Sequence, residues 1–212
     1  MASGTLFLVK SVLDLIVGDP PSDAAQLLAW LASHRLSLAL TNETLVFAAL
    51  LLIPAVLALY RSLDGSHRPW AAFSCALLAA AVPIIVALAI IHGRLMYPVY
   101  GIDVNDPATV ALVVSLYYGG AHEVALQLGV ALIMLGLAMR RGTFGRTAPA
   151  FGVAAGALQI AGAYPWLTGS LLTSITQAMF AAWLVFVGTR LTRFPRAVTA
   201  APRAGVGGPR LP

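Results

Sequence analysis

The chain has 212 residues, of which 59% are apolar and only 10% are Asp, Glu, Lys or Arg. Soluble globular domains carry about 25% charged residues, so this chain has too few of them to cover a surface that faces water. The net charge of +5 comes almost entirely from dispersed arginines. No basic groove with interleaved aromatic residues is present, which excludes a typical nucleic-acid binder. The composition therefore predicts an all-α membrane protein.

The first predicted span, residues 2–18, is short and is interrupted by Lys10 and Asp14. A helix needs about 20 apolar residues to cross a bilayer. Because Lys10 and Asp14 stand four positions apart, they share one face of a helix, where their charges are able to pair. The next segment, 23–38, has the pattern of an amphipathic helix that lies at the membrane interface, with Asp23 as its N-cap.

Five further segments have the length and composition of spanning helices. They cover residues 43–60, 70–93, 119–139, 147–167 and 170–189. Thr41, Asn42 and Glu43 supply an N-cap and an acidic first turn for the second span. Residues 108–118 and 119–139 together are too long for one span. We therefore expect residues 108–118 to form an outer or re-entrant helix that breaks at Gly119 and Gly120. Residues 164–169 are expected to form a tight outer turn.

Arginines near the segment ends orient the predicted spans. Only Arg35 and Arg94 fall on one side of the membrane. The other side holds Arg61, Arg68, Arg140, Arg141, Arg146, Arg190, Arg193, Arg196, Arg203 and Arg210. The positive-inside rule then puts both termini in the cytoplasm, and the alternation of sides requires an even number of spans, for which six is the best number. Residues 1–193 form a single transmembrane bundle in this interpretation, and residues 194–212, rich in Pro, Gly and Ala, a disordered cytoplasmic tail.

Polar side chains inside a bilayer are costly, which makes each of them a candidate for function. In the predicted orientation nearly all of them lie in the outer half of the membrane. This asymmetry predicts one pocket that opens outward, with the third and fourth spans at its centre. The candidate ligand-binding residues are His92, Arg94, Gln127, Tyr117, Tyr118, Gln159, Gln177 and Trp166, and the candidate catalytic residues of an enzyme are Glu123, His122 and Asp14.

A simpler interpretation needs no ligand at all. The same groups would then form hydrogen bonds between helices, and Arg94 would pair with Asp103 or Glu123 at the membrane interface. His92, His122 and Glu123 are residue types that bind metal ions, but they form no tight metal-binding motif. We therefore expect no metal ion and no cofactor.

Two functions follow from the predicted pocket. The first is binding or transport of a small or amphiphilic ligand by an integral membrane protein. The alternative is a membrane-embedded enzyme that acts on a lipid or isoprenoid, of the acid-initiated cyclase or isomerase type. In that enzyme Glu123 or Asp14 would donate a proton, and Tyr117, Tyr118 and Trp166 would stabilise a developing cation through their π faces.

A third interpretation makes the chain a subunit of a membrane complex. Gly152 and Gly156 stand four residues apart and share one helix face, where small residues permit a partner helix to approach closely. The expected partners are therefore membrane lipid, a small or amphiphilic ligand and, through these glycines, another helix; nucleic acid is not expected. Whether the protein is an enzyme is left open by the sequence.

Three features in chain order carry a resemblance to a known family. The first span is followed by Gly18, Asp19, Pro20 and an outer amphipathic segment, and the second span ends in Leu-Ala-Leu-Tyr-Arg-Ser-Leu at 57–63. A histidine-containing fourth span is followed by Arg-Arg-Gly-Thr-Phe-Gly-Arg at 140–146. In this order the chain resembles, over most of residues 5–190, a family of small bacterial polytopic membrane proteins known as domain of unknown function 4386. The resemblance implies a helical membrane bundle and no particular activity.

Overall fold

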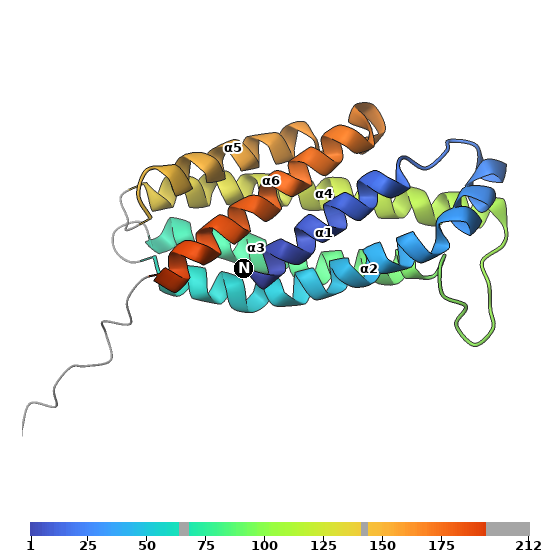
Figure 1. Cartoon of the computed structure of the whole chain (residues 1–212), viewed down its shortest axis with the longest axis horizontal. Coiled ribbons are helices and arrows are strands. Elements are labelled where there is room, and N and C mark those ends of the chain that lie inside the picture. The colour runs from blue at the N-terminus through green and yellow to red at the C-terminus, as the bar shows by residue number, and fades with distance from the viewer. Residues whose placement is uncertain (64–67, 141–143, 194–212) are drawn as a thin grey trace, which may run out of the picture.

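The computed structural model describes residues 1–63, 68–140 and 144–193, and these form six helices (Figure 1). In chain order they are α1 (Ala2–Val17), α2 (Ala24–Arg61), α3 (Arg68–Gly93), α4 (Pro107–Met139), α5 (Thr147–Ala161) and α6 (Pro165–Arg193). The described residues contain no strand, only an isolated bridge between Val99 and Ile102. The all-helical fold class is therefore confirmed. The tail predicted at 194–212 lies outside the described residues.

Four of these helices, α2, α3, α4 and α6, are long and apolar enough to cross a membrane. Large apolar side chains cover the outside of the bundle: Phe47, Phe73 and Ile90, for example, are 57%, 53% and 65% exposed. Water-soluble monomers rarely expose apolar surface of this extent. The helices and the surface around them therefore fit a membrane protein.

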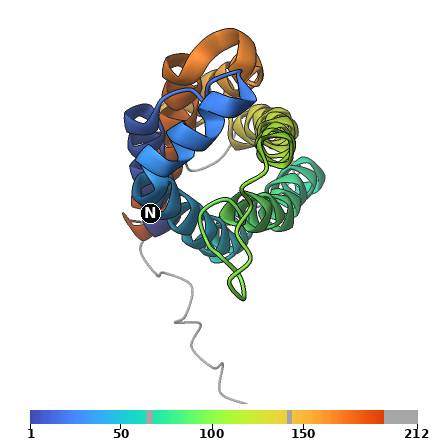
Figure 2. The same cartoon turned by 90° about the vertical axis from the view of Figure 1, so that its right-hand side faces the viewer.

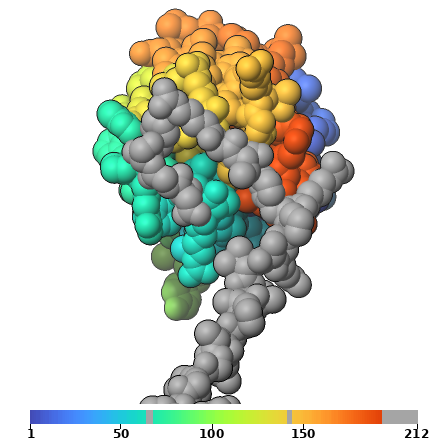
Figure 3. Space-filling model, turned by 90° about the vertical axis from the view of Figure 1, so that its left-hand side faces the viewer, coloured from blue at the N-terminus to red at the C-terminus, as the bar shows by residue number. Residues whose placement is uncertain are grey.

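The six helices form a closed ring, as Figure 2 shows along the bundle. Each helix packs against the next one in the chain, and α1 closes the ring by packing against α6. Successive helices run in opposite directions (Figure 1). We call the end with connections 18–23, 94–106 and 162–164 the loop end. The opposite end, where α2 and α6 finish, is the tail end, which faces the viewer in Figure 3.

Two of the predictions for the segment that forms helix α2 are wrong. The amphipathic helix expected at 23–38 and the span expected at 43–60 are one uninterrupted helix of 38 residues. Asp23 is its N-cap, as predicted, since its side chain accepts a hydrogen bond from the Ala25 amide at 2.8 Å. Thr41 and Asn42, however, lie inside the helix and are buried. No glycine or proline lies near these two residues. Polar side chains alone have too little effect on helix propensity to end a helix whose flanking segments pack against other helices.

Helix α4 corrects a third prediction, because it runs through Gly119 and Gly120 without a break. Glycine costs about 1 kcal/mol relative to alanine inside a helix, a penalty that tertiary packing readily overcomes. Gly120 has a packing role here: a Cβ atom at this position would lie 2.3 Å from Cδ2 of Leu88 on α3. The glycine therefore permits α3 and α4 to approach closely.

The remaining boundaries differ from the predictions in smaller ways. Helix α5 ends at Ala161, earlier than expected, and α6 already begins at Pro165. The bend expected within residues 164–169 falls on Gly169, whose φ of 74° is non-helical and splits α6 into a short first turn and a long segment. Helix α1 has 16 residues and is not among the four helices that meet the length of a span.

At the tail end, apolar side chains surround a second cavity of about 720 Å³, counting the part that is open to the outside. Leu52, Leu78, Leu132 and Trp183 are fully buried there. On α5, a Cβ at Gly156 would lie 2.6 Å from the carbonyl oxygen of Gly129 on α4, so neighbouring helices of the same chain already occupy this small-residue face. A separate cavity, which polar as well as apolar residues line, lies toward the loop end and is the candidate site.

Candidate functional site

A cavity lies inside the ring, toward the loop end, and residues of all six helices line it. It holds about 1190 Å³ of empty space, counting the part that is open to the outside. Its walls are mostly apolar. At the mouth stand Gly18, Asp19, Pro165 and Ser170, and deeper in the ring the floor consists of Phe7, Leu45, Ile85, Leu128 and Phe180. The cavity thus has an apolar floor and opens beside the connections of the loop end.

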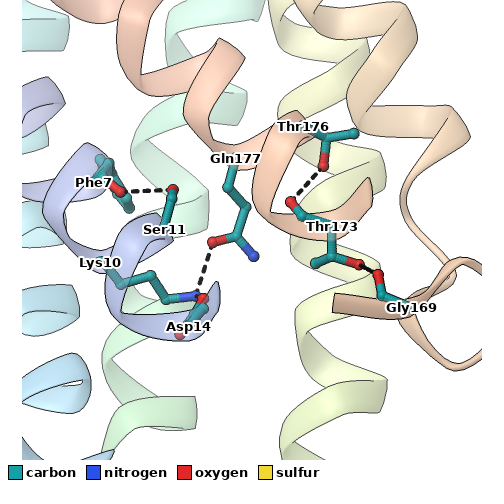
Figure 4. A network of polar contacts seen from close by, with 8 residues as sticks. All are labelled: Phe7, Lys10, Ser11, Asp14, Gly169, Thr173, Thr176 and Gln177. Carbon is teal, nitrogen blue, oxygen red and sulfur yellow. Dashed lines mark hydrogen bonds and ion pairs between the residues drawn. The ribbon is translucent and has the colours of Figure 1, made fainter. Parts of the chain in front are cut away.

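An ion pair forms one wall of the cavity (Figure 4). The ammonium group of Lys10 donates to Asp14 Oδ2 at 2.5 Å, which confirms the predicted pairing on one face of α1. It also donates to Gln177 Oε1 on α6 at 2.9 Å. Lys10 is 6% exposed, whereas the Asp14 side chain is 26% exposed. A charge removed from water is tolerated only when it is paired and hydrogen-bonded, as it is here.

Aromatic rings form the opposite wall. The imidazole of His92 on α3 stacks on the ring of Tyr117 on α4, with centroids 4.2 Å apart and planes 17° from parallel. The ring of Tyr118 meets that of Tyr117 edge-on at 5.3 Å. His92 and Tyr117 are 5% and 8% exposed, so both rings are held in place by the surrounding helices. All three rings line the cavity.

Several neutral polar groups that line the cavity have no hydrogen-bond partner. The Thr41 hydroxyl on α2 is buried, and no atom of the described chain bonds to it. Among the described residues, the side chains of His92, Gln159 and Ser174 likewise make no hydrogen bond, although they are only 5%, 3% and 6% exposed. Buried polar side chains in native proteins are nearly always hydrogen-bonded to protein or to water. These four groups, from α2, α3, α5 and α6, are therefore available to a molecule inside the cavity.

Six of the predicted site residues share this cavity. They are Asp14, His92, Tyr117, Tyr118, Gln159 and Gln177. They come from α1, α3, α4, α5 and α6, and the folded ring is what brings them together. Lys10, Thr41 and Ser174 were missed as site residues. The spacing of Ser170, Ser174 and Gln177 was a usable signal, because residues three and four positions apart share one face of a helix.

The other five predicted site residues lie outside the cavity. Glu123 is exposed on the outside of α4. His122, one residue earlier, bonds through Nδ1 to the Ala163 carbonyl oxygen at 2.7 Å and packs against the rings of Tyr164 and Trp166, 4.6 and 5.4 Å away. His122 and Trp166 therefore form an aromatic cluster at the loop end, separate from the cavity.

Arg94 and Gln127 serve local structure. The Arg94 guanidinium donates to the carbonyl oxygens of Tyr97 and Ile102 at 3.2 and 3.3 Å, which ties down the α3–α4 connection. Gln127 donates through Nε2 to the Leu77 carbonyl oxygen at 2.8 Å and so links α4 to α3. The simpler interpretation, hydrogen bonding between and within elements, describes these two residues.

No family model, no curated protein and no solved structure matches this chain. The resemblance to domain of unknown function 4386 thus stays a prediction.

Proposed function

We propose that this protein is an integral membrane protein that binds a small, uncharged, amphiphilic ligand in the cavity among its helices. The observation that carries the proposal is the polar lining of the cavity. The Thr41 hydroxyl is buried without a hydrogen bond, and the described chain supplies no hydrogen bond to the side chains of His92, Gln159 and Ser174. Leaving a fully buried polar group such as the Thr41 hydroxyl without a hydrogen bond costs about 1–3 kcal/mol. A polar head group, with accompanying water, that completes the hydrogen bonds of these groups best explains their presence on one cavity.

The charges around the cavity favour an uncharged head group. The described ionised groups that line it are Lys10, Asp14 and Asp19. Lys10 and Asp14 neutralise each other, and Asp19 at the mouth accepts a hydrogen bond from the Ser170 amide at 3.1 Å. The Asp19 carboxylate has no ion-pair partner among the described residues, but it is exposed at the mouth. A charged head group held deeper, beside Thr41 and Gln159, would find no unpaired opposite charge there, and burying an unpaired charge is expensive.

The apolar floor favours a ligand with a hydrocarbon part. Phe7, Leu45 and Phe180 are buried and line the deep part of the cavity. Each CH₂ group that moves from water into such surroundings contributes about 0.8 kcal/mol. A chain or ring that fills the floor would set the affinity, and the polar groups above it would select the head group.

In this proposal all six helices cross a bacterial cytoplasmic membrane as one bundle, residues 1–193, with the tail end in the cytoplasm. The support is the charge at that end: α2 finishes at Arg61, α3 begins at Arg68, and Arg140, Arg146 and Arg190 lie beside the other helix ends. Arginine is enriched on the cytoplasmic side of membrane proteins. Helix α1 crosses with its neighbours because it closes the ring between α2 and α6. The cavity would then open outward.

An acid-initiated enzyme is the second candidate, since Asp14, Tyr117 and Tyr118 share the cavity. That arrangement provides a carboxyl group and π faces around one space, as such chemistry requires. The Asp14 side chain, however, is engaged in an ion pair with the Lys10 ammonium. This ion pair favours binding over acid catalysis.

Photo-crosslinking of the full-length protein in lipid vesicles tests the binding proposal. The probe is a fatty alcohol with a diazirine in its chain, and peptide mass spectrometry locates the label. We expect label on floor residues such as Phe7 and Phe180, and we expect excess decanol to remove it. The same chain with a carboxylate or trimethylammonium head should label the floor less. Label confined to the lipid-facing surface, or label that decanol does not displace, would contradict the proposal.

A matched pair of variants sharpens this experiment. Ala125→Phe adds a ring at a cavity-lining position of α4, whereas Ala80→Phe adds the same ring on the exposed face of α3. Floor labelling should fall about tenfold in the first variant, the equivalent of about 1.4 kcal/mol, and remain unchanged in the second. Circular dichroism of both variants checks that they are folded.

A further inference from the structure

Lys10 is the only lysine of the chain, and it lies in the middle of α1 with its side chain on the cavity wall. Replacing a buried ion pair by apolar residues is often neutral or stabilising, so its presence is weak evidence of a role in stability. Ionisable groups at membrane depth generally mark functional sites. The reactivity of the Lys10 amine therefore explains its presence here better than a role in stability does.

The geometry leaves the Lys10 nitrogen one open direction. Two of its three N–H bonds point to Asp14 Oδ2 and Gln177 Oε1 (Figure 4). Within the described residues the third N–H has no acceptor, and the residue lines the cavity. An amine that has lost its proton presents a lone pair, and a lysine amine forms a covalent imine with carbonyl compounds.

We propose that Lys10 is a covalent attachment site for an amphiphile that carries an aldehyde group, a proposal that rests on the binding function proposed above. The ammonium passes one proton to Asp14, and the neutral amine attacks the aldehyde carbon. A C–N bond forms as the C=O π electrons move to oxygen, which takes up a proton from the nitrogen. The hydroxyl group then leaves as water with the proton that Asp14 held, and a protonated imine remains. Nothing is oxidised or reduced.

The charges around Lys10 are compatible with a protonated imine at this position. An ammonium beside a carboxylate becomes an iminium beside the same carboxylate, so the number of buried charges does not change. Asp14 takes the proton in the first step, returns it in the last and finally serves as counter-ion. Gln177, which accepts a hydrogen bond from the same nitrogen, holds the lysine in place from α6. The water released has a route past Asp19 and Ser170 at the mouth.

The walls around Lys10 fit the remainder of such a ligand. Phe7 and Phe180 meet edge-on, with ring centroids 5.2 Å apart, and both line the cavity. The stacked His92 and Tyr117 rings form the other wall. A hydrocarbon or conjugated chain attached to the Lys10 nitrogen would lie between these aromatic surfaces, out of water. The attachment is thereby protected from hydrolysis.

Trapping with sodium cyanoborohydride tests the inference on the full-length protein in detergent, with decanal as the probe. Reduction turns the imine into a stable secondary amine. Fragment-ion sequencing of the peptide then distinguishes an adduct on Lys10, the only lysine, from one on the N-terminal amine. We expect a decyl group on Lys10, and we expect excess decanol, added before the aldehyde, to prevent its formation. No adduct on Lys10, or an equal yield after unfolding in sodium dodecyl sulfate, would overturn the inference.

Two variants separate attachment from binding. Lys10→Arg keeps a cation beside Asp14 but cannot form an imine, so labelling at this position should be lost completely. Asp14→Asn removes the proton acceptor and counter-ion and should lower the trapped yield several-fold. If the wild-type protein binds the alcohol but forms no adduct with decanal, covalent attachment is refuted and binding survives. If the wild-type protein does not bind the alcohol, the binding function itself fails.

Discussion

At the scale of single residues, the cavity contains two kinds of polar group. The charged groups Lys10 and Asp14 satisfy each other, whereas the neutral groups of Thr41 and Gln159 have no partner in the described chain. Mutual pairing explains how the charged groups are tolerated, because an unpaired buried charge would be very costly. The neutral groups have no such partner, and apolar residues at those positions would fold at least as well. The neutral groups are therefore the guide to the binding function.

Replacing Gln159 by Leu should weaken ligand binding without weakening the fold. We expect the crosslinking affinity for the fatty alcohol to fall about 2- to 10-fold, which corresponds to one lost hydrogen bond of about 0.5–1.5 kcal/mol. The melting temperature without ligand should stay the same or rise, because an unpartnered polar group has been removed.

Gln127→Leu is the matched control, since Gln127 donates a hydrogen bond to the Leu77 carbonyl oxygen. It should lower the melting temperature and leave the affinity unchanged. Reversed effects in the two variants would show that Gln159 is a structural residue. The measurements are thermal unfolding by circular dichroism and crosslinking yield against probe concentration.

At the scale of the helices, the sequence predicted where apolar segments lie better than where helices end. The spans at 70–93 and 170–189 fall inside α3 and α6, and residues 2–18 nearly coincide with α1. The breaks expected near Thr41 and at Gly119 are absent, because tertiary packing overrides local helix propensity. Whether a glycine ends a helix or lets a neighbour approach depends on that neighbour, which the local sequence does not specify.

Two glycines illustrate this difference and give a prediction for stability. Gly156→Ala places a Cβ 2.6 Å from the Gly129 carbonyl oxygen, so α4 and α5 must separate, and we expect a loss of about 1–3 kcal/mol. Gly119→Ala meets no atom within 4 Å and should instead stabilise α4 by up to about 1 kcal/mol. Thermal or denaturant unfolding of the two variants in the same detergent measures whether each substitution raises or lowers the stability of the protein. Equal effects would refute the close approach of α4 and α5.

The start of α4 should respond to pH. The Asp106 carboxylate accepts hydrogen bonds from the Thr109 hydroxyl and amide at 2.7 and 2.8 Å, and these bonds hold the pKa of Asp106 below its usual value. Because the pKa of Asp106 is lowered in the folded state, the capping carboxylate contributes its full stabilisation to the helix above the usual aspartate pKa. This stabilisation is lost as the pH falls through the lowered pKa. Hydrogen exchange at the Thr109 and Val110 amides should therefore accelerate, after correction for intrinsic rates, on acidification. Asp106→Ala should abolish this pH dependence.

At the scale of the whole molecule, the gathering of polar residues toward one end of the bundle was visible in the sequence, but the composition of the cavity was not. Asp14, His92 and Gln159 were chosen as candidates because they are polar and at membrane depth, and they do line one cavity. Glu123 was chosen on the same basis and is exposed on the outside of α4. The helix face that turns inward is set by how each helix packs against its neighbours around the ring, which the local sequence does not specify.

The proposed orientation has a direct test with single cysteines in a Cys75→Ala background, since Cys75 is the only cysteine. Asp103 is exposed at the loop end and Thr147 is exposed at the tail end. In intact bacterial cells, a membrane-impermeant maleimide should label Asp103→Cys and should label Thr147→Cys only after the membrane is opened. The opposite pattern would place the mouth of the cavity in the cytoplasm.

The length of α2 has a consequence for how a ligand arrives. At 1.5 Å per residue its 38 residues extend about 57 Å, well beyond the roughly 30 Å of membrane hydrocarbon. Counting about 20 residues back from Arg61 brings the outer hydrocarbon boundary to Thr41, level with the polar groups of the cavity. An amphiphile dissolved in the bilayer already has its head group at this depth. The membrane would then act as the reservoir, so occupancy should follow the mole fraction of ligand in the lipid rather than its concentration in water.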